Sequence, residues 1–427
     1  MMNSKENYYK IVSLFIVLIA STIVFRSLCT VLIILFAIYN IVHFKYLEFP
    51  KAVLKYVALF CLPLLFELIF FWNNATFSLG LKSLEKYISL LIFSVFILGN
   101  YKQLSFFKII NQYRILTTSI LFVLFLRFLI VDYELVAKYL NGVHLWEMGY
   151  KFAESFKNHA PAVNMHVAFL VVLNTYFLLR SKINSKRMLN LICLSISVFL
   201  LFILNTRIAL AVAILGCFFV VIEYFGSKFK PLQVAKILGG VFLLIGTLLV
   251  IGFKSNPYMK EKYGKVTFMY MDKIGKLDEI ENPEVKVFNA FVTRLSIWKS
   301  AYELGLDQPM IGFGSADGKK ELVHYFEKTN QKFLAKYEFP VHNQILDFFV
   351  KFGILGALMS IVYLLIPLIV GIKSRNVLLF SFGFIFLISN LFDDFLIRFD
   401  GIIFYGIWAV IGFVYYLQKR LLAVDIN

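Results

Sequence analysis

The sequence predicts an all-α, polytopic integral membrane protein of about 12 transmembrane helices, with one large, partly helical loop between the ninth and tenth helices. Three observations predict this fold class. Of the 427 residues, 60% are hydrophobic and only 16% are charged, whereas soluble domains contain about 45–50% apolar and about 25% charged residues. Apolar runs near the length of a membrane crossing recur along the chain. Between these runs, Lys and Arg concentrate in alternate loops.

Each long apolar run is predicted to be one transmembrane helix, because a helix needs roughly 20 residues to cross about 30 Å of hydrocarbon. The first run is followed directly by a second, without a clear small-residue cleavage site, so we expect the first to remain as an anchor. The predicted spans are 11–25, 27–43, 54–72, 79–99, 109–131, 163–179, 189–204, 206–224, 237–253, 349–372, 377–392 and 401–417.

The basic residues of the short loops fix the predicted orientation. With the N-terminus in the cytoplasm, the loops on the cytoplasmic side are rich in Lys and Arg, which is the positive-inside pattern of membrane proteins. An even number of spans then places the C-terminus in the cytoplasm as well. The basic residues concerned are Lys45, Lys51, Lys55, Lys102, Lys108, Arg180, Lys182, Lys186, Arg187, Lys228, Lys230, Lys236, Lys373 and Arg375.

Two of the predicted outer loops are long, 132–162 and 254–342. Charges of both signs are mixed in the second, so we interpret it as a small folded element. The chain therefore divides into residues 1–253 with transmembrane helices 1–9, residues 254–342 as the outer loop domain with amphipathic helices, and residues 343–427 with helices 10–12. Function tends to reside in such long loops.

The charge and the cysteines exclude two other classes of function. The net charge of +17 is spread through short loops and forms no basic stripe, so nucleic acid is not a predicted partner. The cysteines lie inside apolar stretches without the spacing of metal ligands, which argues against a disulfide set, a metal site or redox chemistry. They are Cys29, Cys61, Cys193 and Cys217.

The second long loop contains two amphipathic stretches. Apolar residues recur at helical spacing over 288–302, and Gly305 is a plausible helix stop. A second apolar face runs over 322–337, with lysines and glutamates opposite. Between them, the Pro- and Gly-rich segment 309–318 predicts a flexible turn. Both stretches suit a helix that lies along a membrane surface or covers a cavity.

His342 is the candidate general base. It lies at the end of the loop, where a helix is predicted to enter the membrane through Ile345 and Leu346. At a helix N-terminus the macrodipole disfavours the imidazolium and attracts anions, so a neutral ring can accept a proton there. The alternative is a surface histidine that only caps the helix.

Three basic residues are predicted on the same outer side. Arg207 interrupts the apolar region between the seventh and eighth spans, and its alternative role is to snorkel to the interface. Arg294 lies at the flank of the first apolar stripe of the loop and could simply be solvated. Lys86 begins the fourth span and could pair with Glu85.

Taken together, these groups favour a lipid-linked diphosphate as ligand. Two guanidinium groups can bind phosphate oxygens in bidentate fashion and neutralise the charge that grows on a leaving diphosphate. A neutral imidazole can take the proton of an incoming hydroxyl. The predicted reaction is therefore glycosyl transfer at the outer membrane surface.

Other outward-facing polar residues are less specific. Asp393, Asp394 and Arg398 crowd the last outer loop, where they could pair structurally or contact an acceptor. No metal is predicted, because two carboxylates without further ligands make a poor site. Glu67 lies within the third span, where a carboxylate needs a partner that the sequence does not identify.

A group of polar residues at the mouth of the sixth span is predicted to cap that helix. It consists of His159, Asn164 and His166.

Five segments together carry a family resemblance. They are Asn205 to Arg207, Thr293 to Ala301, Pro309 to Gly314, and His342 to Gln344 followed by Phe352 to Gly356. In this order, and with the long outer loop, they resemble the O-antigen ligase and polymerase superfamily, most closely from about 200 to 360.

The resemblance implies a metal-independent, inverting glycosyltransferase of the bacterial inner membrane whose site faces the periplasm. It implies an undecaprenyl diphosphate-linked glycan as donor and no cofactor. His342 would be the base for the acceptor hydroxyl, Arg207 and Arg294 would hold the diphosphate, and Lys86 matches a basic position of some members.

Several functions fit this chemistry. In the leading one, the acceptor is the core oligosaccharide of lipid A, as for an O-antigen ligase in lipopolysaccharide biosynthesis. In the alternative, a polysaccharide polymerase, the acceptor is another lipid-linked repeat unit, and transfer to protein hydroxyls is a third variant. A flippase or similar carrier is disfavoured, because no matched halves with broken helices occur and the candidate charges gather on one side.

Overall fold

A computed structural model of the chain describes residues 2–141, 147–182, 185–230, 268–288 and 290–424, with a few single or paired residues between 232 and 247. Within these ranges every regular element is an α-helix or a short 3-10 helix, and none is a strand. The all-α prediction is confirmed. The predicted ninth span, 237–253, lies almost entirely outside the described residues.

The N-terminal half is a series of helices joined by short connections. They are α1 (Met2–Ser21), α2 (Arg26–Val42), α3 (Lys51–Phe60), α4 (Leu62–Ile69), α5 (Phe77–Leu98), α6 (Phe106–Val131), α7 (Tyr133–Leu140), α8 (Met148–Glu154), α9 (Ala160–Arg180), α10 (Ser185–Leu204) and α11 (Arg207–Gly226).

The C-terminal half begins with short elements and ends with three long helices. Its described elements, in chain order, are η5 (Met271–Lys273), η6 (Leu277–Glu279), α14 (Pro283–Lys286), α15 (Phe291–Asp307), α16 (Gly318–Lys328), α17 (Lys332–Lys336), α18 (Gln344–Ser374), α19 (Val377–Phe392), η7 (Phe395–Ile397) and α20 (Phe399–Val424).

Six helices of the described chain are long and apolar enough to cross a membrane: α6, α9, α10, α11, α18 and α20. The apolar helices α2 and α19 are shorter. The chain is thus a multi-pass membrane protein, although about 12 spans were predicted. The predicted span 54–72 is not one helix, because it is interrupted at Cys61 between α3 and α4. Pro63 follows in the first turn of α4, and a proline cannot sit in the interior of a continuous helix without breaking its hydrogen bonds.

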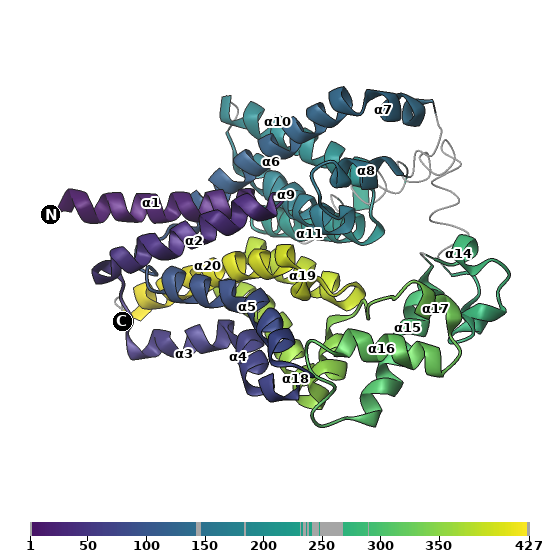
Figure 1. The fold of residues 1–427 in the computed structure, drawn as a ribbon. Helices are drawn as coiled ribbons and strands as arrows, with labels where there is room; N and C mark the ends of the chain where they lie inside the picture. The colour runs from purple at the N-terminus through teal and green to yellow at the C-terminus, as the bar shows by residue number, and fades with distance from the viewer. Residues whose placement is uncertain are drawn as a thin grey trace.

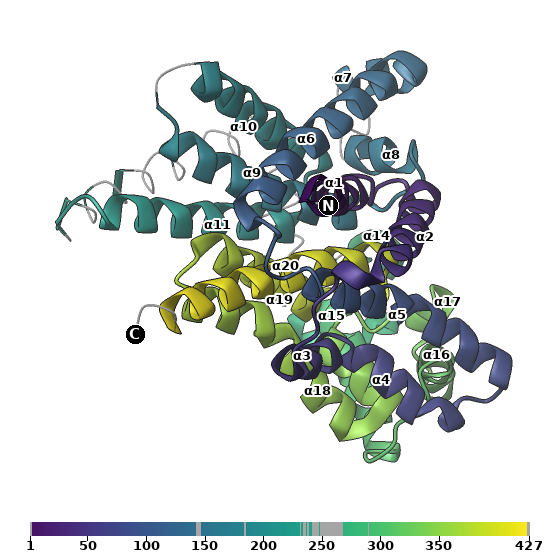
Figure 2. The ribbon, with the colours of Figure 1, turned by 90° about the vertical axis from the view of Figure 1, so that its left-hand side faces the viewer.

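The bundle is organised around α19 and α20. In both ribbon views these helices lie between a group formed by α6, α9, α10 and α11 and a group formed by α3, α4 and α18 (Figures 1 and 2). The side chains of α20 from Ile402 to Ile411 are buried throughout. A helix that is apolar on all sides is expected at the centre of such a bundle.

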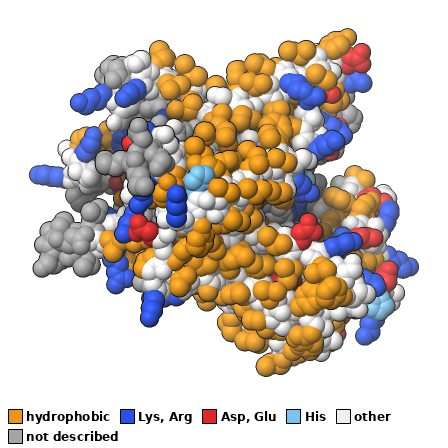
Figure 3. Space-filling view, turned by 60° about the vertical axis from the view of Figure 1, so that its left-hand side comes forward, with side chains coloured by type: hydrophobic (Ala, Val, Ile, Leu, Met, Phe, Trp, Pro, Cys, Tyr) orange, Lys and Arg blue, Asp and Glu red, His pale blue; other side chains and the backbone are white. Residues whose placement is uncertain are grey.

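The charged side chains mark the two ends of the bundle. The N-terminal end of α1 and the C-terminal end of α20 lie at one end, and α14 to α17 lie at the other (Figure 1). Figure 3 shows apolar side chains over the middle of one face, with Lys and Arg gathered toward the first end and charges of both signs near the second. An apolar band between two charged ends is the surface that a bilayer requires.

The described part of the outer loop, which we call the loop domain (residues 268–341), has an apolar core of its own. Leu304 on α15, Leu322 and Phe326 on α16 and Phe333 on α17 are buried together in it. The predicted second helix over 322–337 is in fact two, because Asn330 takes a left-handed backbone conformation (φ 55°) and ends the first.

The first loop helix also differs from its prediction. It begins at Phe291 and continues to Asp307, so Gly305 is not a stop. Gly305 is instead the point where α15 meets α18, since a Cβ there would lie 2.3 Å from the ring of Phe349. The absence of a side chain allows this close packing.

The turn between α15 and α16 is anchored, where a flexible turn was predicted. Helix α18 is kinked at Gly353 (φ 66°, ψ −159°), which frees backbone groups that a continuous helix would pair. Phe313 N donates to Val350 O (2.8 Å) and Gly314 N donates to Lys351 O (3.0 Å). Ile354 N donates to Pro309 O (2.8 Å). These three bonds fix the loop domain to the start of α18, where His342 lies.

Candidate functional site

His342 lies between the loop domain and α18, in the left-handed region (φ 53°). Its neighbour Asn343 caps the helix, because the Asn343 side chain accepts hydrogen bonds from the backbone N–H groups of Ile345 and Leu346. The carbonyl of His342 accepts a bond from Trp298 Nε1 (3.3 Å). The interpretation of His342 as a helix cap is therefore wrong, and its imidazole is available for other contacts.

The imidazole of His342 contacts Asp393. Its Nδ1 lies 3.1 Å from Asp393 Oδ1. Burial raises the pKa of Asp393, but the hydrogen bond to His342 and the charge of Arg398 outweigh it and hold that pKa below its usual range. An ionised carboxylate only accepts hydrogen bonds, so Nδ1 must carry the proton. In the neutral imidazole, the Nε2 atom of His342 is then left with a lone pair, as a general base requires.

Arg398 joins the two adjacent carboxylates. Its Nη2 lies 3.3 Å from Asp393 Oδ1 and 3.4 Å from Asp394 Oδ1. Asp394 is fully buried, and its backbone N–H donates to Asp393 Oδ1 (2.9 Å). Burial and the nearby charge of Asp393 raise the pKa of Asp394 to about 6. The two neighbours in sequence thus differ: Asp393 is ionised beside His342, and Asp394 holds its proton more tightly.

His159 is the next group in this chain of contacts. Its Nδ1 lies 3.4 Å from Arg398 Nη1 and accepts from it, and its side chain makes no cap bond to α9. Burial and the charge of Arg398 lower the pKa of His159. The capping role predicted for His159 is therefore wrong, and this histidine belongs to the same cluster as His342.

Arg294 also faces this cluster. The charges of Asp393 and Asp394 act on its guanidinium, and burial lowers the pKa of Arg294. Its Nη1 is buried and lacks a hydrogen-bond partner within the described part of the chain. Arg294 is therefore not the solvated helix-face charge that the sequence left open.

Arg207 lies close enough to Arg294 for the two charges to oppose each other. It is the first residue of α11. The preceding Thr206 is held by a hydrogen bond from Asn164 Nδ2 (2.8 Å). Two guanidinium groups that repel each other in a partly buried place are stabilised by an anion between them.

Lys86 lies in a second charged group. The charges that act on it are those of Lys351, Glu67 and Asp347, and no arginine is among them. Lys351 Nζ is 2.6 Å from Asp347 Oδ2. The buried carboxylate of Glu67, whose partner was unknown, accepts a hydrogen bond from the hydroxyl of Ser315 in the turn before α16. Of the predicted residues, the structure brings His342, Arg207 and Arg294 together. Lys86 lies instead near Glu67, which contacts the turn between α15 and α16.

Three residues of the cluster could hold a metal ion. One ligand atom from each of His342, Asp393 and Asp394 lies within 4.8 Å of the others, so the structure supplies a third potential ligand to the two carboxylates. Arg398 already pairs with the two carboxylates of Asp393 and Asp394, and the charge of Arg294 acts on them too. A divalent cation placed there would meet two fixed positive charges.

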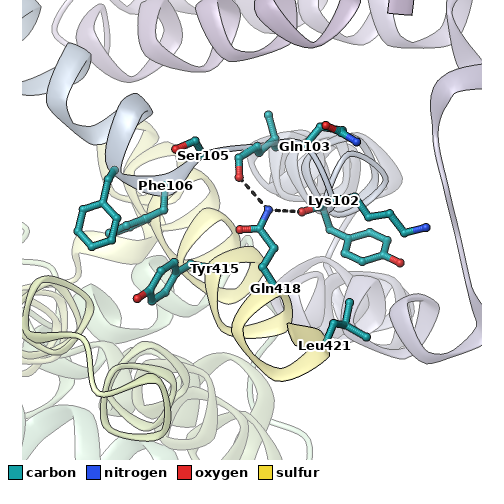
Figure 4. A pocket seen from close by; sticks show the side chains of 10 residues that line it. Lys102, Gln103, Ser105, Phe106, Tyr415, Gln418 and Leu421 are labelled. Carbon is teal, nitrogen blue, oxygen red and sulfur yellow. Dashed lines mark hydrogen bonds between the residues drawn. The ribbon is translucent and has the colours of Figure 1, made fainter. Parts of the chain in front are cut away.

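A cavity of about 520 Å³ lies elsewhere (Figure 4). It is near the C-terminal end of α20, which is far from the loop domain in Figure 1. It is lined by the connection between α5 and α6 and by the last turns of α20. Gln418 Nε2 bonds the carbonyls of Tyr101 (2.6 Å) and Leu104 (2.9 Å) there. This cavity contains no histidine or carboxylate in its lining, and we do not assign the reaction to it.

Two features of the site could not be predicted from the sequence. The contact between His342 and Asp393 joins segments 51 residues apart, and no local pattern distinguishes Asp393 from Asp394. Tyr150, on α8, carries an exposed ring on which the charges of Arg294 and Arg207 act. Its only signal in the sequence is the length of the outer loop 132–162.

The comparisons with known proteins agree with the geometry. Residues 191–361 match the family model described as O-antigen ligase. This range includes Arg207, Arg294 and His342, and ends within α18 after its kink. A search of curated proteins found no match. The family match confirms the resemblance seen in the sequence motifs: over residues 191–361, this multi-pass membrane protein is similar to the O-antigen ligase family.

Proposed function

We propose that the protein is an inner-membrane glycosyltransferase that moves a glycan from undecaprenyl diphosphate to the core oligosaccharide of lipid A on the periplasmic side, as an O-antigen ligase does. The observation that carries the proposal is the hydrogen bond between His342 and Asp393 (3.1 Å) beside the opposed guanidinium groups of Arg207 and Arg294. The site pairs a base with an anion-binding place.

In the proposed reaction, His342 Nε2 takes the proton of an acceptor hydroxyl. The hydroxyl oxygen attacks the anomeric carbon of the donor sugar, and the bond from that carbon to the diphosphate oxygen breaks. The electron pair of the broken bond stays on the departing undecaprenyl diphosphate. This single displacement inverts the anomeric configuration. Asp393 holds the imidazole in the productive tautomer and stabilises the imidazolium that forms.

Arg207 and Arg294 bind the diphosphate and stabilise the charge that develops on it. Arginine presents a planar fork of N–H donors that matches phosphate oxygens. The buried Nη1 of Arg294, which has no hydrogen-bond partner among the described residues, is a donor that a phosphate oxygen would satisfy. In this proposal the arginines supply the positive charge, and the reaction is metal-independent.

A polymerase of the same superfamily would use the same donor chemistry with a different acceptor. The decisive experiment supplies purified protein with an undecaprenyl diphosphate-linked glycan and lipid A core, and identifies the products by mass. Glycan on the lipid A core supports the ligase proposal. Longer lipid-linked chains would instead support a polymerase. Glycosylated protein would instead support transfer to protein hydroxyls. Movement of donor across vesicles without covalent transfer would contradict any transferase.

A further inference from the structure

Helix α8 brings a tyrosine from the first long outer loop to the site. Met148, Gly149, Phe152 and Ala153 are buried, and Gly149 packs so closely on α10 that a Cβ would lie 2.5 Å from Ile203 O. At 100° per residue, Tyr150 points away from this packed face. Its side chain is thus presented outward by a short helix whose other face is fixed.

Tyr150 faces the charged cluster. Tyr150 as a whole residue is 37% exposed, and its ring lies edge-on to the ring of His159, with the ring centroids 6.5 Å apart. The charges of Arg294, Arg207 and Asp393 act on its hydroxyl. No described residue provides a hydrogen-bond partner for this hydroxyl, although a phenol O–H is a good donor.

The cluster has unused hydrogen-bond donors. Arg294 Nη1 and Arg398 Nε are buried without an acceptor among the described residues. The Tyr150 hydroxyl, on which the charge of Arg294 acts, is a third donor of the cluster. Buried donors without acceptors cost free energy, and an anion with several oxygens would satisfy them.

We infer that the Tyr150 hydroxyl is a third donor of the diphosphate site and bonds an oxygen of the departing undecaprenyl diphosphate, beside Arg207 and Arg294. This inference rests on the proposed function for the identity of the anion. The phenol keeps its proton throughout and only donates a hydrogen bond. That bond strengthens as negative charge grows on the diphosphate, so it stabilises the transition state more than the bound donor.

The test is Tyr150→Phe, which removes one oxygen atom and keeps the ring. Hydrogen bonds to charged groups contribute about 1.5–3 kcal/mol, so glycan transfer should fall by about 10- to 160-fold. Inhibition by the product undecaprenyl diphosphate should weaken as well. Tyr133→Phe is the matched control, because Tyr133 is an exposed tyrosine of the same outer loop, on α7, and should leave both properties unchanged.

Other outcomes separate the possible roles of Tyr150. Full transfer by Tyr150→Phe together with loss in Tyr150→Leu would show that the ring acts by packing or by contact with a sugar, and would overturn the inference. Weaker binding of undecaprenyl diphosphate to Tyr150→Phe, in a protein that transfers no glycan, would support the inference while the proposed function fails. Equal binding of undecaprenyl diphosphate by wild type and Tyr150→Phe would overturn the inference whatever the activity.

Discussion

The Nδ1 atom of His342 lies 3.1 Å from Oδ1 of Asp393, although 51 residues separate them in the chain. The contact forms because His342 lies just before Asn343, the cap residue of α18, while Asp393 immediately follows α19, and these two antiparallel helices pack side by side. Asn343 Nδ2, which donates to Leu391 O (3.0 Å), fixes the two segments together at this point. The pair is therefore held by the bundle itself.

Asp393→Asn tests this contact. An amide cannot stabilise an imidazolium, and its N–H₂ group can turn toward Nδ1 and favour the wrong tautomer of His342. We expect the kcat of glycan transfer to fall by at least about 100-fold, as for other histidine bases that lose an orienting carboxylate. The KM for the lipid-linked donor should change little. Asp272→Asn, at an exposed carboxylate of the loop domain, is the control. An unchanged kcat in Asp393→Asn would show that Asp393 does not orient the base.

The fold class, the membrane character and the motifs around Arg294 and His342 could be predicted from the sequence, because hydropathy and local spacing carry them. The partner of His342 could not, since Asp393 and Asp394 are adjacent carboxylates whose difference arises only from packing. The role of Gly305 was missed for a similar reason. A glycine near a helix end is typical of a stop, and only the approach of Phe349 shows it to be a packing contact.

Removing the charge of Arg294 should affect activity, whereas removing the charge of Arg398 should affect stability. The charges of Asp393, Asp394 and Arg207 all act on Arg294, but Arg294 makes no ion pair within 4.0 Å with a described residue and its Nη1 has no described partner, so Arg294→Met should abolish transfer without lowering the thermal midpoint of unfolding in detergent. Arg398 pairs with Asp393 and Asp394, so Arg398→Met should lower that midpoint, because it leaves buried carboxylate charge unpaired. Equal destabilisation by both variants would mean that Arg294 is a structural ion-pair residue.

The stability of the protein should depend on pH through Asp394. The pKa of Asp394 is raised to about 6 by burial and by the charge of Asp393, compared with about 3.9 in an unfolded chain. The folded state therefore binds this proton more tightly. Its contribution to stability is complete below about pH 4 and is lost as the pH rises through about 6.

Asp394→Asn removes this titration. We expect the thermal midpoint of Asp394→Asn to rise relative to that of the wild type as the pH is raised from about 4 to about 7, measured in one detergent at constant ionic strength. A difference that stays constant over this range would show that Asp394 does not titrate there.

The kink of α18 should tolerate no side chain at Gly353. An alanine there would hold a left-handed backbone (φ 66°), and its Cβ would lie 2.5 Å from Met310 C and from Pro309 O. We expect Gly353→Ala to lower the free energy of unfolding by about 1–3 kcal/mol from backbone strain alone. Gly226→Ala is the control, since a Cβ at Gly226 meets nothing within 4 Å. Equal midpoints for the two variants would mean that the contact between the kink at Gly353 and the turn before α16 does not fix the loop domain to α18.

The most direct test of the proposed mechanism is glycan transfer by purified His342→Ala, compared with wild type and with His324→Ala. His324 is an exposed histidine of α16 whose nearest charged partner is Glu327 (3.6 Å), so its variant controls for the loss of an imidazole elsewhere in the loop domain. Loss of a general base lowers rates by about 10²- to 10⁴-fold. We predict that decrease for His342→Ala with wild-type rates for His324→Ala, and a folded His342→Ala protein that transfers glycan at the wild-type rate would contradict the assignment of His342 as the base.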